Sequence, residues 1–249
     1  MKKEKVRLDK LLVDRGLATS IQHATGVILS GNVSVDGLMS DKAGRLVEEN
    51  ADITVKKIMP YVSRGGLKLE EALRSFNINV EDTIAIDIGA STGGFTDCLL
   101  QHGAKKVYSI DVGYGQLHWK LREDPRIVNL EKTHILRLDW GLIKDTIDIA
   151  TADLSFISLT KILPALWEHL PSSAKIIALV KPQFEVNKGE VGQGGIVRDI
   201  KKRENAVNNV AQFAENIGFK IKGLIPSPIL GQKGNVEYLL YLEKIKNQI

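Results

Sequence analysis

The sequence predicts an α/β protein in two parts: a small N-terminal α+β domain over residues 1–59, and a larger domain over residues 60–249 built on a doubly wound, mostly parallel sheet of seven strands. Two observations predict this fold class. From Tyr61 onward, apolar runs of strand length alternate with segments of helical periodicity, as in repeated β-α units. Before residue 56, two short amphipathic helices and a hairpin signal form a separate pattern.

The composition excludes several classes of protein. Hydrophobic residues make up 43% of the 249 residues and charged residues 26%, which is typical of globular domains. No apolar run approaches the roughly 20 residues that cross a bilayer, and the basic start lacks the apolar segment of a secretory signal. Cys98 is the single cysteine, so no internal disulfide forms, and no Cys/His spacing indicates a metal site. We expect a cytoplasmic protein with no membrane partner and no metal.

The N-terminal domain is expected to contain two helices and a small sheet. Leu8, Leu11 and Leu12 recur at helical spacing. Gly16 ends that helix, and Ser20 can cap a second one. The expected strands lie at residues 33–35 and 53–55, with a hairpin turn at residues 36–37. Residues 1–15 carry six basic side chains against three acidic ones, and this local excess permits phosphate contacts.

This pattern resembles the alpha-L RNA-binding domain, which occurs in a small-subunit ribosomal protein, in pseudouridine synthases and in tyrosyl-tRNA synthetases. The resemblance rests on residues 7–12 (RLDKLL), 15–16 (RG), 20–24 (SIQHA) and 31–37 (GNVSVDG). It implies that side chains of this domain contact RNA backbone without reading sequence. The residues expected to do so are Lys5, Arg7, Lys10, Arg15 and Gln22. A protein-binding or purely structural role is the alternative.

Residues 87–95 (DIGASTGGF) follow an apolar run and predict a strand, a tight glycine turn and a helix. Glycines permit positive φ and a close approach of a ligand, while free N–H groups at the helix start face it. The spacing Gly-x-x-x-Gly-Gly differs from the dinucleotide-binding Gly-x-Gly-x-x-Gly, and no Gly-Lys-Ser/Thr follows, which argues against NAD and ATP. Asp111 ends the next apolar run, where its carboxylate can accept two ribose hydroxyls. Together these signals resemble the S-adenosylmethionine (SAM) methyltransferases; a turn that serves packing alone is the alternative.

The larger domain is expected to place its ligand at one edge of the sheet. The expected strands are residues 84–88, 107–111, 126–130, 147–153, 175–180, 219–225 and 236–242. The expected helices are residues 66–76, 94–102, 115–122, 158–169 and 199–217. In such sheets the ligand crevice lies at the carboxyl ends of the strands. The polar residues that fall there, and that are costly to bury without partners, are Asp87, Asp111, Asp153 and Lys181.

Two lysines and two acids form a candidate catalytic set. Lys68 lies near the start of a helix, and Glu237 enters the last strand. At this point the chain resembles the TlyA family, often labelled hemolysin A, whose catalytic domain is similar to the FtsJ-type 2′-O-ribose methyltransferases. The resemblance covers residues 7–242, and it places the Lys-Asp-Lys-Glu tetrad of that type on Lys68, Asp153, Lys181 and Glu237. A network of surface ion pairs is the alternative.

The resemblance implies a SAM site formed by the glycine turn and the strand ends beside it. Its expected residues are Asp87, Gly89, Ala90, Ser91, Thr92, Gly93, Gly94, Phe95, Asp111, Val112, Thr133 and Asp153. Arg64, which precedes the tetrad's first lysine, is expected to contact RNA. Where the FtsJ type has an acid facing adenine after the third strand, this chain reads NLEKT over residues 129–133, which leaves the adenine contact open.

Methyl transfer to a ribose needs in-line positioning and removal of a proton from a weakly acidic hydroxyl. We assign Lys181 as the base, with the other three tetrad residues orienting it and the hydroxyl. The expected function is SAM-dependent 2′-O-methylation of ribosomal RNA, with ribosomal RNA or ribosomal subunits rather than DNA as the partner. The family resemblance suggests cytidine as the target. The alternatives are a non-catalytic RNA-binding or ribosome-assembly factor and a cytolysin, which would require a secreted or membrane-inserting segment.

Overall fold

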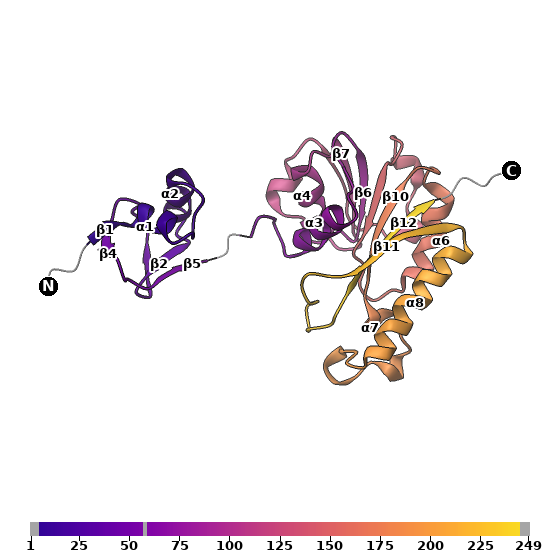
Figure 1. Cartoon of the computed structure of the whole chain (residues 1–249). Helices are drawn as coiled ribbons and strands as arrows, with labels where there is room; N and C mark the ends of the chain where they lie inside the picture. The colour runs from indigo at the N-terminus through magenta and orange to yellow at the C-terminus, as the bar shows by residue number, and fades with distance from the viewer. Residues whose placement is uncertain (1–4, 57–58, 245–249) are drawn as a thin grey trace. The chain divides into compact units, whose positions relative to one another are not determined.

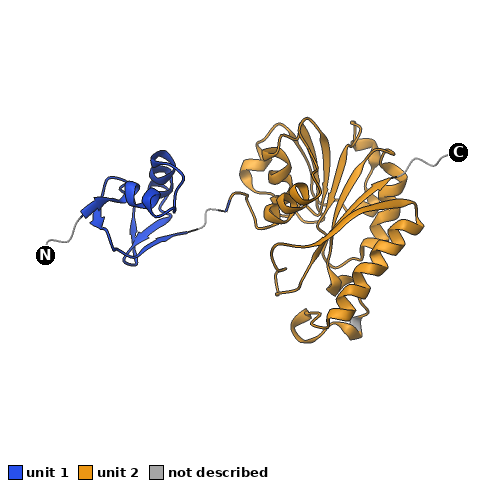
Figure 2. Ribbon diagram, viewed as in Figure 1, with its two compact units in different colours: residues 1–59 blue, residues 60–249 orange. Residues whose placement is uncertain are grey.

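A computed structural model of the chain describes residues 5–56 and 59–244. The chain divides into two compact units, residues 1–59 and 60–249 (Figure 2). Each unit has its own hydrophobic core: one cluster of buried residues belongs to the first unit and two belong to the second. The two units are therefore described separately.

The N-terminal unit packs two helices against short strands. Its elements are β1 (Lys5–Arg7), α1 (Leu8–Asp14), α2 (Ile21–Leu29), β2 (Val33–Val35), β3 (Leu38–Ser40), β4 (Leu46–Glu48) and β5 (Ile53–Val55). The antiparallel order is β3-β2-β5, and β1 pairs separately with β4. Leu8, Leu12 and Ile28 are fully buried. Ser20 caps α2 as predicted, because its side chain accepts the His23 N–H at 3.1 Å.

The second unit is built on a seven-stranded sheet in the order β11-β12-β10-β9-β6-β7-β8 (Figure 1). Its strands are β6 (Ile84–Ile88), β7 (Lys106–Ile110), β8 (Ile127–Leu130), β9 (Ile149–Ala152), β10 (Lys175–Val180), β11 (Phe219–Pro226) and β12 (Tyr238–Lys244). All neighbours pair in parallel except β12, which is antiparallel to both β10 and β11. The predicted doubly wound, mostly parallel sheet is confirmed.

Helices cover both faces of this sheet. They are α3 (Gly65–Ser75), α4 (Gly94–Gln101), α5 (Trp119–Arg122), α6 (Leu159–His169), α7 (Pro182–Glu185) and α8 (Ile200–Asn216), with short 3₁₀ turns η1 (Ile135–Arg137), η2 (Trp140–Leu142), η3 (Lys188–Glu190) and η4 (Gln193–Gly195). Successive side chains of a strand point to opposite faces. Ala85 and Val107 therefore join the cluster of α3, α4 and α5, while Ile86 and Tyr108 join that of α6 and α8.

One helix is shorter than the sequence predicts. A helix was expected over residues 115–122, but α5 occupies only its last four residues. Gly115 has φ of 74°, which lies outside the helical region, and the His118 side chain caps the helix by accepting the Lys120 N–H. None of the helices in the described part of the chain is long and apolar enough to cross a membrane.

The strand order reverses between β6 and β9. The chain runs outward from β6 through β7 to β8, and then returns to place β9 on the other side of β6. Helices leave these two neighbouring strands on opposite faces, so a crevice opens at their carboxyl ends. The segments that enter this crevice are the glycine turn after β6 and the loop after β9.

Candidate active site

The turn after β6 is packed so tightly that its glycines leave little room for a side chain. Gly89 has φ of +85°, and a Cβ there would lie 2.6 Å from the backbone oxygen of Asp153. A Cβ on Gly94 would lie 2.2 Å from Ser63 Oγ, just before α3. The turn therefore packs directly on the backbone of Asp153 after β9 and on the Ser63 side chain before α3. That close contact brings three distant parts of the sequence to one edge of the sheet.

Asp87 lies beneath the turn rather than in a cavity, although the sequence placed it among the cofactor-binding residues. The side chain is fully buried. Its carboxylate accepts hydrogen bonds from Thr96 Oγ1 at 2.7 Å and from Thr151 Oγ1 at 2.9 Å. Burial raises the pKa of Asp87 to about 6, while the two threonine hydrogen bonds oppose that shift. Asp87 thus supports the turn from inside the fold.

This raised pKa predicts a pH-dependent stability. Because the folded pKa lies above the unfolded value of 3.8, the folded state binds more protons between the two values, and the free energy of unfolding falls as pH rises through that window. Asp87→Asn keeps the shape and loses the charge. Between pH 5 and 7.5, wild type should therefore lose about 1 kcal/mol of stability relative to Asp87→Asn. Urea unfolding of both proteins across that range measures the difference, and parallel curves would contradict it.

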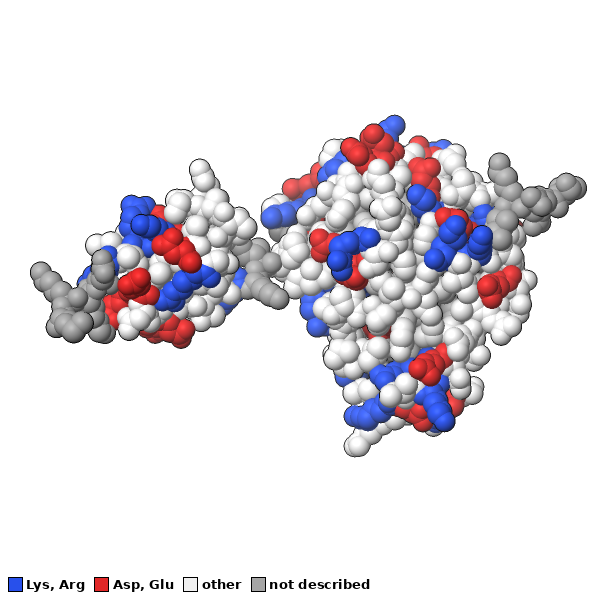
Figure 3. Space-filling view, in the orientation of Figure 1, with Lys and Arg blue, Asp and Glu red and all other residues white. Residues whose placement is uncertain are grey.

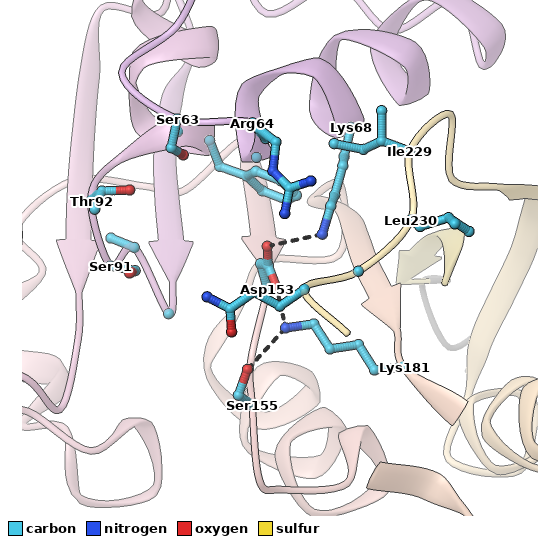
Figure 4. Close-up of a pocket in the computed structure, with 17 residues that line it drawn as sticks. Ser63, Arg64, Lys68, Ser91, Thr92, Asp153, Ser155, Lys181, Ile229 and Leu230 are labelled. Carbon is cyan, nitrogen blue, oxygen red and sulfur yellow. Dashed lines mark hydrogen bonds and ion pairs between the residues drawn. The ribbon is translucent and has the colours of Figure 1, made fainter. Parts of the chain in front are cut away.

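Two adjoining cavities open beside the turn. One, of about 340 Å³, lies against β6, β7 and the loop after β9, and the predicted cofactor residues that line it are Gly89, Ser91, Asp111, Val112, Thr133 and Asp153. The other, of about 380 Å³, is lined by Gly89, Ala90, Ser91, Thr92, Gly94, Phe95 and Asp153 of that set, together with Arg64, Lys68 and Lys181 (Figure 4). The two cavities meet at Gly89, Ser91, Asp153 and Ser155.

Asp111 stands at the rim of the first cavity, at the end of β7. Its Oδ2 accepts the Ser91 N–H at 2.8 Å, and its Oδ1 accepts the Gly113 N–H at 2.7 Å. Each carboxylate oxygen has a second lone pair. The side chain is therefore oriented by the backbone and keeps acceptor capacity for a ligand.

Two residues of the predicted cofactor and adenine segments have other roles in the structure. Gly93 lines neither cavity; it is the N-cap of α4 with φ of +95°, and a Cβ there would lie 2.3 Å from Leu121 Cδ1. Glu131 also lines neither cavity. Its carboxylate accepts the Gly115 N–H at 3.0 Å and pairs with Arg122 at 2.7 Å. Both residues fix the segments that surround the first cavity.

The four residues predicted as a catalytic set form one continuous chain of charge contacts. Glu237 Oε2 lies 2.6 Å from Lys68 Nζ, which lies 3.9 Å from Asp153 Oδ2. Asp153 Oδ1 in turn lies 2.5 Å from Lys181 Nζ. Figure 4 shows the two lysines converging on Asp153 from opposite sides. Lys68 and Lys181 are each 8% exposed and Glu237 is 3% exposed, so this network lies inside the crevice and not on the surface.

Ser155 is a site residue that sequence reasoning missed. Lys181 Nζ donates a hydrogen bond to Ser155 Oγ at 3.0 Å, and Ser155 lines both cavities. Its only sequence signal is its place two residues after Asp153, which does not distinguish it from other loop serines. In the part of the chain that the structure describes, no group of three or more His, Cys, Asp or Glu side chains lies together as a metal site requires.

Comparisons with known proteins agree with this arrangement. A family model described as FtsJ-like methyltransferase matches residues 61–244, and an S4 domain model matches residues 6–53. The chain belongs to the FtsJ-like methyltransferase family. The match spans the sheet and all four charged residues of the crevice. The expected resemblance, an RNA-binding domain followed by an FtsJ-like domain, is confirmed.

Relatives of this FtsJ-like protein align over nearly its whole length. The 16S/23S rRNA (cytidine-2′-O)-methyltransferase TlyA of Mycobacterium tuberculosis is 47% identical over 96% of this chain and 90% of that protein. Hemolysin A of Brachyspira hyodysenteriae is 44% identical over 95% of this chain and 99% of that protein. A solved structure named "Putative hemolysin from Streptococcus thermophilus" is 44% identical with a TM-score of 0.74, covering 98% of this chain and 90% of that chain. Relatives of this chain are thus named either as rRNA methyltransferases or as hemolysins.

The N-terminal unit of this FtsJ-like methyltransferase carries the residues predicted to contact RNA. Lys5, Lys10 and Gln22 are exposed. Arg7 pairs with the buried Asp9 at 2.5 Å. Arg15 donates to the backbone oxygen of Ala51 at 2.8 Å and to that of Glu49, so its guanidinium also ties α1 to the chain after β4. On the face in Figure 3, basic and acidic side chains of this unit are interspersed.

Proposed function

We propose that this protein is a SAM-dependent methyltransferase that modifies a ribose 2′-hydroxyl of ribosomal RNA, with cytidine as the target nucleoside. The observation that carries the proposal is the buried chain of contacts from Glu237 through Lys68 and Asp153 to Lys181, which borders a cavity next to the glycine turn. Relatives named rRNA (cytidine-2′-O)-methyltransferase support the substrate. The cytoplasm, where ribosomes are assembled, is the proposed place of action.

The residues around the turn fit SAM. The cavity of about 340 Å³ combines apolar walls with Asp111 at its rim, which suits a nucleoside whose ribose hydroxyls need an acceptor. Ser91, Val112 and Thr133 would hold this part. The amino-acid part would lie where the two cavities meet, beside Gly89, Ser91 and Asp153. When bound, SAM supplies an electrophilic methyl group.

The tetrad gives the second cavity the means to hold and deprotonate a hydroxyl. Asp153 and Ser155 fix Lys181 Nζ from two directions, and Glu237 fixes Lys68 Nζ. Lys181, in its neutral form, accepts the proton of the 2′-hydroxyl, and Asp153 stabilises the ammonium that results. Lys68, held by Glu237, donates toward the oxygen that becomes negative. Glu237 positions Lys68 and Asp153 positions Lys181, so that both amines would face the 2′-oxygen of the ribose.

The S4 domain supports an RNA substrate. Its exposed Lys5, Lys10 and Gln22 provide contacts to phosphate and sugar, which position a protein on RNA without reading sequence. Arg64 extends this role to the catalytic unit, since it is exposed and lines the cavity that contains Lys181. We propose that the N-terminal unit docks on ribosomal RNA while the catalytic unit receives the target nucleotide.

The reaction product tests this function. Purified 16S and 23S ribosomal RNA and intact ribosomal subunits from a strain that lacks this protein are incubated with SAM and the protein, then digested to nucleosides for mass spectrometry. We expect 2′-O-methylcytidine to accumulate. RNA binding without a methylated product would indicate a non-catalytic assembly factor, and a base-methylated nucleoside would contradict the ribose assignment. Protein incubated without SAM is the matched control.

A further inference from the structure

Glu185 is a partly buried acid that lies close to the tetrad without belonging to it. It is the last residue of α7, the short helix that begins immediately after Lys181. Its Oε2 accepts the Ser158 hydroxyl at 2.5 Å, and its Oε1 accepts the Leu159 N–H at 2.9 Å. Burial raises the pKa of Glu185, and its hydrogen bonds with Ser158 and Leu159 oppose that shift. Both of its partners belong to the start of α6, where an anion is favoured by the helix dipole.

The two segments that Glu185 joins are the ones that hold Lys181. One is the loop from Asp153 to Ser158, which carries two polar contacts of the Lys181 ammonium, Asp153 Oδ1 at 2.5 Å and Ser155 Oγ at 3.0 Å. The other is α7, which has Lys181 as its N-cap. The Glu185–Ser158 hydrogen bond therefore joins α7, which follows Lys181, to the segment that carries Asp153 and Ser155. Lys181 and its two polar partners are thus connected by a second contact besides their own.

The conformation of the Asp153–Ser158 loop requires contacts with neighbouring segments to hold it. Phe156 in its middle has φ of 66°, a conformation that a residue with a side chain adopts only when its surroundings hold it there. The Phe156 side chain is 90% exposed, so burial contributes little to that hold. Contacts of the loop with α7 do contribute: the Phe156 ring lies 5.1 Å from that of Phe184, centroid to centroid, and Ser158 is bound to Glu185.

We propose that Glu185 is a positioning residue for methyl transfer. Its hydrogen bonds with Ser158 and Leu159 keep the Asp153–Ser158 loop against α7. Asp153 and Ser155 can then hold the Lys181 ammonium in place. The inference rests on the proposed function. Glu185 lines neither cavity, so it acts through the loop and touches no substrate. Its loss loosens the base together with the loop residues Asp153 and Ser155, which line both cavities.

The kinetic test uses Glu185→Ala in the full-length protein under single-turnover conditions. With SAM and RNA at saturating concentrations, so that binding does not limit the rate, the rate constant for methyl transfer should fall about 10-fold to 100-fold, the range expected when a reacting group is misplaced by about 1 Å. Glu185→Gln should retain most of the rate, because its amide oxygen can accept the Leu159 N–H and its NH₂ can donate to Ser158 Oγ. Ser158→Ala should lower the rate similarly, and the double variant should show no further loss.

A second readout does not depend on activity. The rate at which an amine-acylating reagent labels Lys181, measured by peptide mass spectrometry, should rise in Glu185→Ala, with Lys175 at the start of β10 as the internal reference. Asp199→Ala, which removes the side-chain cap of α8, is the matched control and should leave Lys181 labelling unchanged. Unchanged labelling and an unchanged rate in Glu185→Ala, with only a lower Tm, would overturn the proposal and leave Glu185 as a helix cap. If wild type methylates no RNA, the proposed function fails, while the labelling result still decides whether Glu185 restrains Lys181.

Discussion

Replacing Lys181 with alanine should lower the rate constant for methyl transfer about 10²-fold to 10⁴-fold, the contribution typical of a general base. The physical reason is that Lys181 Nζ is aimed at the second cavity by Asp153 and Ser155, and alanine offers no proton acceptor there. Lys181→Arg should be inactive as well, because a guanidinium keeps the positive charge and does not release its proton at neutral pH. Transfer of a labelled methyl group to ribosomal subunits measures both variants.

Two measurements distinguish loss of the base from loss of the folded structure. Lys175→Ala is the matched control, because Lys175 begins the strand whose other end precedes Lys181, and it should keep the wild-type rate. SAM affinity, measured by calorimetry, should be unchanged in Lys181→Ala, since the first cavity does not include this residue. A Lys181→Ala variant that transfers methyl at the wild-type rate would show that the base lies elsewhere.

Gly89→Ala should both destabilise the protein and weaken SAM binding. The residue has φ of +85°, where a Cβ costs about 1–2 kcal/mol from the backbone alone, and this Cβ would also lie 2.6 Å from the backbone oxygen of Asp153. The turn or the loop after β9 must therefore move, and both line the two cavities. We expect a lower Tm in thermal unfolding and at least a tenfold loss of SAM affinity in calorimetry, because 1.4 kcal/mol corresponds to about tenfold in binding.

The chain offers a matched glycine for this experiment. A Cβ on Gly189 would meet no atom within 4 Å, and its φ lies outside the left-handed region. Gly189→Ala should therefore change neither the Tm nor SAM affinity. If Gly89→Ala behaved like Gly189→Ala, the turn would be free to accept a side chain, and the account of its close packing would be wrong.

Local sequence signals predicted those parts of the site that depend on local geometry. The glycine turn, its preceding strand and the acid at the end of β7 are readable because few residue types suit such positions: glycine is the residue that adopts positive φ at low cost, and a charge at a buried strand end needs a partner. The Lys-Asp-Lys-Glu set was found through family resemblance, and the structure shows that these four side chains are in contact. They come into contact because β9, β10 and β12 are neighbours in the sheet, an order that cannot be inferred from local sequence.

The features that the sequence did not reveal depend on tertiary environment. Asp87 looked like a ligand residue because it precedes the glycines, yet it is satisfied by Thr96 and Thr151 inside the fold. The expected helix over residues 115–122 is cut short by the conformation of Gly115, although the apolar spacing favours a longer one. Ser155 and Glu185 gave no periodic or motif signal, because their partners come from other segments of the chain.

The contact between Lys68 and Glu237 joins residues 169 positions apart in the sequence. One lies on the first helix of the catalytic unit and the other just before its last strand, so the site is complete only when the C-terminal strand has been inserted into the sheet. A growing polypeptide that already contains Asp153 and Lys181 still has a lysine at position 68 without its carboxylate. A chain interrupted before Glu237 therefore lacks the carboxylate that fixes Lys68, and the four charged residues come together only after β12 has joined β10 and β11 in the sheet.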